Sequence, residues 1–291
     1  MLSLVLPKGS LEVATLALFQ DADLAVVRSS DVDYRATISD PRVSDVRILR
    51  PQEIPGYVAE GRFDLGVTGR DWIEETSSDV VTLAELPYSK VSDAPVRIVL
   101  AVGERTSARE VSELPAGLRI HTEYPELTRR YCERSGLNAV ISLSYGATEA
   151  KVPDIADAVV EITETGRALR AAGLRIIDTV LTSNTELIAN PTAYADPAKR
   201  EAMEQLKILL MGTLEARGQV LLKLNVDRSR LAEVVALLPA LDAPTVSDLA
   251  GGDACAVETV VNKSDINVLI PALKDKGATG IIELAISKII H

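Results

Sequence analysis

The residues best suited to chemistry stand between 157 and 170, where an apolar, strand-like run ends and a helical segment begins. Four polar residues follow that run: Glu161, Thr163, Glu164 and Thr165. The first N–H groups of a helix lack intrahelical partners and its dipole favours an anion, so a phosphate group can bind at such a junction. Gly166 allows close backbone approach, and the two carboxylates could accept bonds from ribose hydroxyls or support Mg²⁺. A capped helix after a strand explains the segment equally well, so both interpretations stay open.

Two other strand-to-helix turns carry charged residues. Residues 66–71, Gly-Val-Thr-Gly-Arg-Asp, place Arg70 and Asp71 at the start of a helix, although most turns of this form are only structural. Lys8 follows the first strand, at the end where open α/β sheets bind ligands, but a lone lysine there is more often solvated. The sequence contains neither GxGxxG nor GxxxxGK[ST], so a Rossmann or P-loop nucleotide site is not supported.

The elements that must position these residues alternate between strand and helix. Short apolar runs predict strands at 2–6, 46–49, 63–68, 96–102, 119–122 and 158–161. Helices are expected after a cap at Ser10, across 51–60, after Gly69 and after Pro125, which is the order typical of a parallel α/β sheet. The unbroken run 96–102 fits a strand covered on both faces. Because 187–189 looks like a strand that returns to the first unit, we expect two α/β lobes with a cleft between them.

The pattern changes after residue 196. Asp196 can cap a long helix that starts at Pro197 and ends before Gly218. Strand-like runs at 220–224, 256–261 and 281–284, with a fourth at 245–249, alternate with two segments of helical spacing. The order is that of a ferredoxin-like βαββαβ module of about 75 residues. Pro271 should kink the second helix of this module or delay its start.

Length and composition limit the function classes. The chain has 291 residues, with 31 Lys and Arg against 42 Asp and Glu, so its net charge is −11. This length predicts two or three units, and a hydrophobic fraction of 47% with 25% charged residues excludes disorder, collagen and coiled coil. Apolar runs stay at about five residues, far below the roughly 20 that a membrane helix needs. No secretion signal is recognisable, so we expect a cytoplasmic protein.

Metal clusters and nucleic-acid binding are not indicated. The cysteines, Cys132 and Cys255, lie far apart, and His121 and His291 are the only histidines, so a disulfide framework or zinc site is not expected. An acidic chain also lacks the basic face typical of nucleic-acid-binding proteins. An anionic ligand would therefore need a locally basic site or one built from backbone N–H groups.

Taken together, six motifs resemble the long form of the ATP phosphoribosyltransferase family, the first enzymes of histidine biosynthesis. The motifs span 6–9, 50–61, 64–71, 119–125, 146–149 and 156–169. The resemblance implies a two-lobed catalytic unit, similar to type II periplasmic binding proteins, followed by a regulatory ACT-like domain with a ferredoxin-like fold. Lobe I, on the ATP side, would comprise 1–92 and 180–215 with the linker helix. Lobe II, on the phosphoribosyl pyrophosphate side, would comprise 93–179, and the histidine-binding domain 216–291.

The resemblance also assigns roles to individual residues. Catalytic roles fall to Glu161, Glu164 and Lys8, and the two glutamates would hold the metal. Phosphoribosyl pyrophosphate would be bound by Thr163, Thr165, Gly166, Arg167, Ala168, Leu169 and Glu149. ATP would be bound by Lys8, Gly69, Arg70, Asp71 and Tyr124, and the histidine effector by Asn225, Thr245, Gly277 and Ala278. The family usually has Asp where this chain has Glu161, and Thr or Ser where it has Ala168. The first difference lengthens the carboxylate side chain, and the second removes one phosphate donor.

The implied reaction joins N1 of ATP to C1 of phosphoribosyl pyrophosphate and releases pyrophosphate, with Mg²⁺ as cofactor. L-Histidine would act as a feedback inhibitor, and the subunits would form a homo-oligomer, a hexamer assembled from dimers. Neither nucleic acid nor a membrane is an expected partner. The alternatives are a two-lobed protein that binds a small molecule, or an amino-acid sensor, in either case without catalysis.

Overall fold

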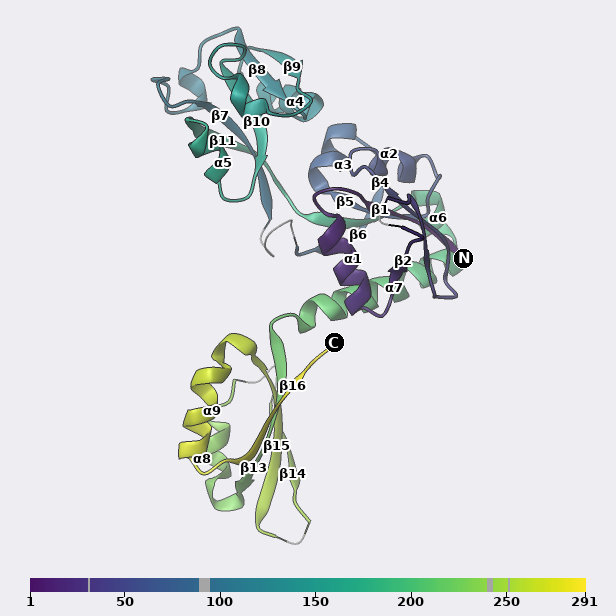
Figure 1. Ribbon diagram of the computed structural model, residues 1–291, viewed down its shortest axis with the longest axis vertical. Coiled ribbons are helices and arrows are strands. Elements are labelled where there is room, and N and C mark those ends of the chain that lie inside the picture. The colour runs from purple at the N-terminus through teal and green to yellow at the C-terminus, as the bar shows by residue number, and fades with distance from the viewer. Residues whose placement is uncertain (31, 89–94, 240–242, 251) are drawn as a thin grey trace. The chain divides into compact units, whose positions relative to one another are not determined.

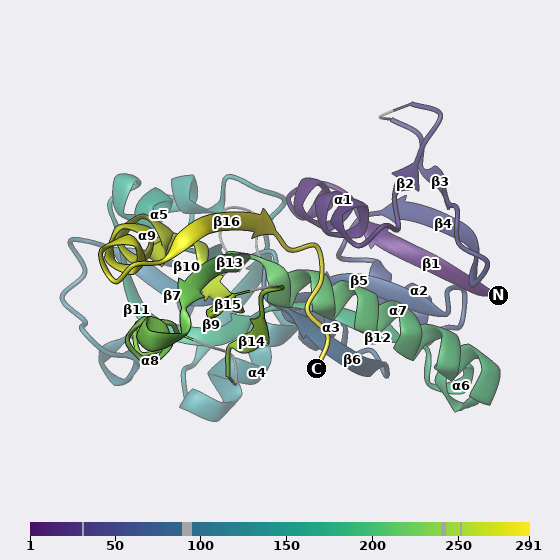
Figure 2. The ribbon, with the colours of Figure 1, turned by 90° about the horizontal axis from the view of Figure 1, so that it is seen from below.

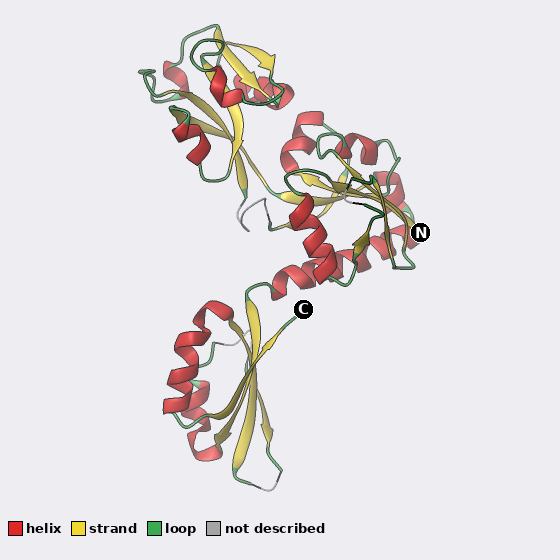
Figure 3. Cartoon of the chain, in the orientation of Figure 1, coloured by secondary structure: helices red, strands yellow, loops and turns green. Residues whose placement is uncertain are grey.

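The computed structural model describes residues 1–291 except 31, 89–94, 240–242 and 251. The chain divides into two compact units, Met1–Lys207 and Ile208–His291. The boundary falls inside a helix, α7 (Pro197–Ala216), which therefore contributes to both units. The expected border between the lobes at 92 and 93 lies outside the described residues. Figure 1 labels the elements, and Figure 3 distinguishes helices from strands.

The first sheet has seven strands in the order β2-β3-β4-β1-β5-β12-β6. Their bounds are β1 Leu2–Pro7, β2 Val26–Val27, β3 Arg35–Ile38, β4 Val43–Leu49, β5 Leu65–Gly69, β6 Val81–Leu86 and β12 Thr185–Ala189. The β1 strand pairs in parallel with β4 and β5, as the strand–turn–helix pattern predicts. The returning strand β12 is inserted antiparallel between β5 and β6. The helices that connect these strands are α1 Glu12–Asp21, α2 Ile54–Ala59 and α3 Arg70–Thr76.

The second sheet has five strands in the order β11-β7-β10-β8-β9. Their bounds are β7 Val96–Gly103, β8 Leu118–Thr122, β9 Ala139–Leu143, β10 Ala158–Thr163 and β11 Leu174–Ser183. The β7 strand is buried along its centre, as its apolar run predicts, but both of its neighbours are antiparallel. Two α-helices and two 3-10 helices connect the strands: α4 Pro125–Ser135, α5 Arg167–Ala171, η1 Val111–Glu113 and η2 Thr148–Lys151. The chain thus enters the second sheet after β6 and leaves it between β11 and β12.

Helix starts show where local signals determine the structure. Asp196 caps α7 (Pro197–Ala216) as expected, because its Oδ1 accepts the N–H groups of Ala198 and Lys199 at 2.9 and 3.1 Å. The preceding short helix, α6 (Pro191–Ala195), is labelled in Figure 2. Its N-cap is Asn190, whose side chain accepts the Ala193 N–H at 2.9 Å. The expected cap at Ser10 is wrong, since α1 begins at Glu12 and its N-cap makes no side-chain hydrogen bond. None of the helices in the described ranges is long and apolar enough to span a membrane.

The second unit has the predicted βαββαβ order. A four-stranded antiparallel sheet, β14-β15-β13-β16, carries two helices on one face (Figure 1). The bounds are β13 Gln219–Asp227, η3 Arg228–Arg230, α8 Leu231–Val235, β14 Thr245–Asp248, β15 Ala254–Asn262, η4 Lys263–Asp265, α9 Ile266–Asp275 and β16 Thr279–Ala285. Alternate residues of β13, from Val220 to Val226, are buried against the helices. Helix α9 starts at Ile266 and continues through Pro271, so the expected late start is not observed. Two α/β lobes and a ferredoxin-like module confirm the predicted fold class.

Candidate active site

A cavity of about 290 Å³ is lined by both sheets of the first unit. The first sheet contributes the end of β5 and the start of α3, and the second contributes the end of β10 and of β11. The lining includes Ser10, Leu11, Pro51, Gly69, Asp71, Trp72, Tyr88, Val96, Ile162, Thr163, Glu164, Ser183, Asn184 and Thr185. Two of the three strand-to-helix turns that carry candidate functional residues, those around Asp71 and Thr163, therefore meet at one cavity.

Asp71 brings a buried carboxylate to this cavity. It is 3% exposed, and its Oδ1 accepts a hydrogen bond of 2.7 Å from the hydroxyl of Ser183, whose oxygen in turn accepts the Asp71 N–H at 3.0 Å. The carboxylate folds back over Gly69 so closely that a Cβ there would lie 2.1 Å from Oδ1, so the turn requires glycine. Burial raises the pKa of Asp71, although the bonds from Ser183 and Tyr124 oppose this shift.

Tyr124 joins the two lobes at this carboxylate. Its hydroxyl donates to Oδ2 of Asp71 at 2.8 Å, and its ring lies 4.6 Å from that of Trp72, tilted by 33°. The phenol is 2% exposed, and burial followed by the nearby Asp71 charge raises its pKa well above the usual value. Tyr124 does not line the cavity, so it orients Asp71 and Trp72, which do.

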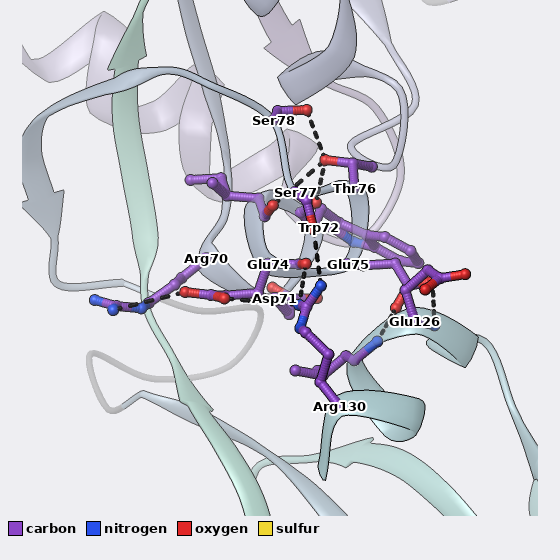
Figure 4. A network of polar contacts seen from close by, with 12 residues as sticks. Arg70, Asp71, Trp72, Glu74, Glu75, Thr76, Ser77, Ser78, Glu126 and Arg130 are labelled. Carbon is purple, nitrogen blue, oxygen red and sulfur yellow. Dashed lines mark hydrogen bonds and ion pairs between the residues drawn. The ribbon is translucent and has the colours of Figure 1, made fainter. Parts of the chain in front are cut away.

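Hydrogen bonds join the C-terminal part of α3 to α4 (Figure 4). The Glu75 carboxylate accepts the N–H groups of Glu126 and Leu127 at 3.0 and 2.8 Å, at the start of α4. In the opposite direction, Arg130 donates to the Glu74 carbonyl and to the Ser77 hydroxyl at the end of α3. A negative group thus meets the positive end of one helix, and a positive group meets the negative end of the other. Because Tyr124 directly precedes α4, this contact also positions its hydroxyl near Asp71.

The turn after β10 is organised around Thr163 and Gly166. The buried Thr163 hydroxyl accepts the Gly166 N–H at 2.8 Å, and Gly166 has φ +72°, a conformation that side chains disfavour. The Arg170 guanidinium reaches back to the Thr165 carbonyl at 3.0 Å. Helix α5 has only five residues, so the donors here are those of the turn more than those of a strong helix dipole.

Other residues expected at this turn differ in their surroundings. Arg167 and Ala168 are exposed, whereas Leu169 is 2% exposed and packs in the core with Val99 and Leu174. The Leu169 side chain therefore cannot reach a ligand, and only its backbone could. Thr165 is exposed, and its hydroxyl accepts the Arg167 N–H in a long bond of 3.4 Å.

The expected carboxylates are not arranged as one cluster. Glu164 lines the cavity, whereas Glu161 does not. Glu161 is half-buried in β10, where burial raises its pKa and the charges of Glu123 and Glu149 raise it further. Within the described ranges, no group of three His, Cys, Asp or Glu residues is placed to hold a metal ion.

The two basic residues expected to bind ATP lie apart from the cavity lining. The Lys8 ammonium stands 4.1 Å above the ring of Tyr34, and Ser10 and Leu11 line the cavity near that turn instead. The Arg70 guanidinium lies 3.8 Å from both Glu74 and Glu186. Its side chain is about half exposed, so it remains accessible to an anion.

In the second unit, the expected effector residues are only partly gathered. Asn225 pairs with Thr279 across β13 and β16, so it lies next to the turn formed by Gly277 and Ala278. Thr245 is exposed on β14, which is separated from β13 by β15. Gly277 has φ +91° beside the Arg230 side chain, and Ala278 is buried. Asn225 and the glycine turn therefore form one candidate site, with Thr245 two strands away.

Sequence reasoning missed three residues of the site. Ser183 holds Asp71 from a position 112 residues later in the chain, and Glu75 and Arg130 join two helices 51 to 56 residues apart. No local pattern marks them, because a serine at a strand end and charges on exposed helices are common. The structure also places Trp72 in the cavity wall.

Comparisons with known proteins agree over the whole chain. Residues 50–212 match the family model HisG, ATP phosphoribosyltransferase, and residues 216–288 match the model of the HisG C-terminal domain. ATP phosphoribosyltransferases of Pelodictyon phaeoclathratiforme and Desulforudis audaxviator are 47% and 48% identical. Both alignments cover 99% of this chain, and they cover 97% and 99% of those relatives.

A solved structure supports the same assignment. It is the ATP phosphoribosyl transferase (HisG:HisZ) complex from Thermotoga maritima, with a TM-score of 0.64 and 28% identity. The match covers 75% of this chain and 99% of that one. The chain therefore belongs to the ATP phosphoribosyltransferase family, whose members are pentosyltransferases of histidine biosynthesis.

Proposed function

We propose that this enzyme transfers the 5-phosphoribosyl group of phosphoribosyl pyrophosphate to N1 of ATP and releases pyrophosphate, the first step of histidine biosynthesis. The observation that carries the proposal is the cavity where the Asp71 and Thr163 turns meet. Its volume of about 290 Å³ is near the lower end for small-molecule sites, so it would hold the reacting ends while the rest of each substrate extends outside.

In this proposal, the Thr163–Leu169 turn binds the 5-phosphate of phosphoribosyl pyrophosphate. Backbone N–H groups at the start of a helix suit a phosphate, and the Arg170 guanidinium, which lies against Gly166, would add positive charge at this turn. Thr165 and Arg167 are exposed and can add a hydroxyl and a guanidinium. Glu149 and Glu161, both half-buried, would accept bonds from ribose hydroxyls.

ATP would lie on the first-lobe side of the cavity. Trp72 offers an aromatic face for the adenine, and the buried carboxylate of Asp71 is a strong acceptor for an amino group at its edge. Arg70 and Lys8, at strand ends outside the lining, would meet the triphosphate. Because the chain carries −11, this local positive charge must outweigh a repulsive background, and ATP affinity should fall as salt rises.

The proposed reaction does not require a strong general base. Adenine N1 already has a lone pair, so it can attack C1 of the ribose without losing a proton. The rate enhancement would come from holding N1 and C1 in line and from fixed dipoles near the developing charge. A cavity lined from both lobes suits this task, because each lobe can orient one substrate.

Mg²⁺ would be held at this site mainly by the substrate. Mg²⁺ is usually bound through one or two protein carboxylates together with substrate phosphates, so a cluster of three protein ligands is not needed. Glu164 in the cavity wall and Glu161 on the adjoining strand would hold it. When bound, the ion would neutralise charge on the pyrophosphate leaving group.

Regulation would reside in the second unit. L-Histidine would bind beside Asn225 and the Gly277–Ala278 turn, where the Asn225 side chain can hydrogen-bond its polar groups. The sheet face opposite the helices exposes Ile282 and Leu284, which are 52% and 43% accessible. A second copy of the chain would cover this apolar face, consistent with a homo-oligomer of dimers up to a hexamer.

An omission assay tests the proposed reaction. Pyrophosphate formation should require ATP, phosphoribosyl pyrophosphate and Mg²⁺ together, and should stop when any one is left out. Pyrophosphate formation without ATP would mean hydrolysis of the phosphoribosyl donor and would contradict the proposal. A two-lobed binding protein without catalysis would form no pyrophosphate under any of these conditions.

A further inference from the structure

A second pocket, of about 550 Å³, lies in the second sheet away from the candidate active site. Six residues line it: Glu104, Arg109, Arg170, Leu174, Arg175 and Ile176. They come from the loop after β7, the helix α5 and the start of β11, which are labelled in Figure 1. The pocket shares no lining residue with the cavity around Asp71. Three arginines against one glutamate give it a net charge of +2 in a chain of −11.

Arg175 is half-buried in this pocket and has no carboxylate partner among the residues that the structure describes. One of its nitrogens, Nη2, donates to the carbonyls of Thr106 and Ala108 at 2.9 and 2.7 Å. Its Nε–H is buried and has no acceptor within the described ranges. Buried donors in folded proteins are nearly always satisfied, and carbonyl dipoles offset a guanidinium charge less than an anion does. The Nε–H of Arg175 therefore lacks the hydrogen-bond acceptor that a bound anion would supply.

The other two arginines leave the pocket with further unused donors. Arg170 donates to the carbonyl of Thr165 at 3.0 Å, again to a neutral group. The Arg109 side chain is exposed and forms no ion pair among the residues that the structure describes. Three guanidinium groups of like charge repel one another when they share a pocket, and a bound anion removes that repulsion.

We propose that this pocket is a second anion site that binds the dianionic phosphate group of a small metabolite. A dianion matches the net charge of the lining, and its oxygens suit the planar, forked donors of arginine. The volume exceeds that of a phosphate group and leaves room for an attached organic part, as in typical small-molecule sites. Because it is separate from the Asp71 cavity, the site does not depend on the proposed transfer reaction.

Inorganic phosphate is a suitable probe, and Arg109→Gln is the most informative variant. Arg109 lines the pocket but makes no described side-chain bond, whereas Arg175 supports the loop and Arg170 supports the neighbouring turn. Arg105→Gln is the matched control, because Arg105 is exposed on the same loop and does not line the pocket. Phosphate that binds at the candidate active site contributes equally to all three proteins.

Equilibrium dialysis of the full chain with radiolabelled phosphate, at fixed ionic strength and without other substrates, gives the test. Losing a charge-assisted hydrogen bond, about 1.5–3 kcal/mol, should weaken one class of phosphate site by about tenfold or more in Arg109→Gln. Arg109→Glu should abolish that class, and Arg105→Gln should bind like the wild type. Equal binding by the wild type and both Arg109 variants would overturn the proposal. Thermal unfolding checks that all the variants are folded.

Discussion

Burial changes both the pKa and the mobility of the Asp71 carboxylate. Hydrogen bonds from Ser183 and Tyr124 keep both carboxylate oxygens satisfied, yet desolvation still dominates and raises the pKa. The same contacts fix the carboxylate in one orientation at the cavity wall. Such a preorganised acceptor can recognise the edge of a base without side-chain reordering when the ligand arrives.

The raised pKa of Asp71 predicts a specific pH dependence of stability. In the unfolded chain the carboxyl titrates near 3.8, and in the folded chain at higher pH. Below 3.8 it is protonated in both states, and as pH rises through the folded pKa the charge must form in a buried site, so stability falls. Relative to Asp71→Asn, the wild type should therefore lose thermal stability as pH rises from about 4. Parallel melting curves of the two proteins across this range would show that Asp71 does not titrate in this way.

Alanine substitutions at two glycines with nearly the same backbone conformation can distinguish backbone strain from lost ligand binding. Gly166 and Gly173 have φ of +72° and +71°, so alanine should strain each by a similar ~1–2 kcal/mol. A Cβ at Gly166 would lie 2.8 Å from the Arg170 guanidinium, whereas one at Gly173 meets no atom within 4 Å. Gly166→Ala should thus push Arg170 off the turn and raise the KM for phosphoribosyl pyrophosphate by about tenfold.

Steady-state kinetics on both variants check this prediction. Gly173→Ala should keep a KM close to that of the wild type, because it carries the strain without altering the turn. If the two variants change KM equally, backbone strain is responsible and the phosphate lies elsewhere.

At the residue scale, the position of the turn follows from local sequence, whereas the roles of its side chains stay predictions. The bond between Thr163 and Gly166 spans three residues at the point where the expected strand ends. The bond from Ser183 to Asp71 spans 112 residues and depends on how the second sheet returns to the first. The returning strand at 187–189 was expected from its apolar run, but the sequence does not say which residues meet where the chain returns, so the partner of Asp71 could not be predicted.

At the scale of elements, the reciprocal capping of α3 and α4 predicts that Glu75 positions Tyr124. Glu75→Ala leaves two N–H groups of α4 without their acceptor, at about 0.5–2 kcal/mol for a lost cap. A loosened α4 start should shift Tyr124 from Asp71 and raise the KM for ATP severalfold, with a smaller change in the KM for phosphoribosyl pyrophosphate. Steady-state kinetics with each substrate varied in turn measures this difference.

Glu126→Ala is the control for this experiment. Its side chain pairs on the surface with Arg129, three residues on, and such pairs contribute only about 0.2–0.5 kcal/mol. This variant should keep both KM values near those of the wild type. Unchanged ATP kinetics in Glu75→Ala would show that the helix contact is structural only.

Element starts were predictable when the capping residue had no competing role. Asp196 caps α7 because its carboxylate faces free N–H groups directly. Ser10 lies in the cavity wall instead, and the Gly9 N–H donates to Glu12, so the first turn of α1 forms without a side-chain cap. The antiparallel neighbours of β7 could not be read from its apolar run, because burial on both faces is compatible with either direction.

At the scale of the whole molecule, the two units divide chemistry from regulation in our proposal. Asn225→Ala in the full chain should therefore leave turnover unchanged and weaken inhibition by L-histidine. Losing one hydrogen bond of about 0.5–1.5 kcal/mol corresponds to a two- to tenfold rise in the inhibitory concentration. Asn262→Ala, at the exposed end of β15, is the control and should be inhibited normally. An unchanged histidine response in Asn225→Ala would place the effector elsewhere.

The proposed transfer is tested most directly by following the ribose carbons. The full chain is incubated with ATP, Mg²⁺ and phosphoribosyl pyrophosphate that carries isotope-labelled ribose, and the products are separated and weighed by mass spectrometry. We predict that the label appears on ATP, attached through the adenine, with one pyrophosphate released for each labelled molecule. Label recovered only in free ribose phosphate, or on ATP through another group, would contradict the transfer to adenine N1.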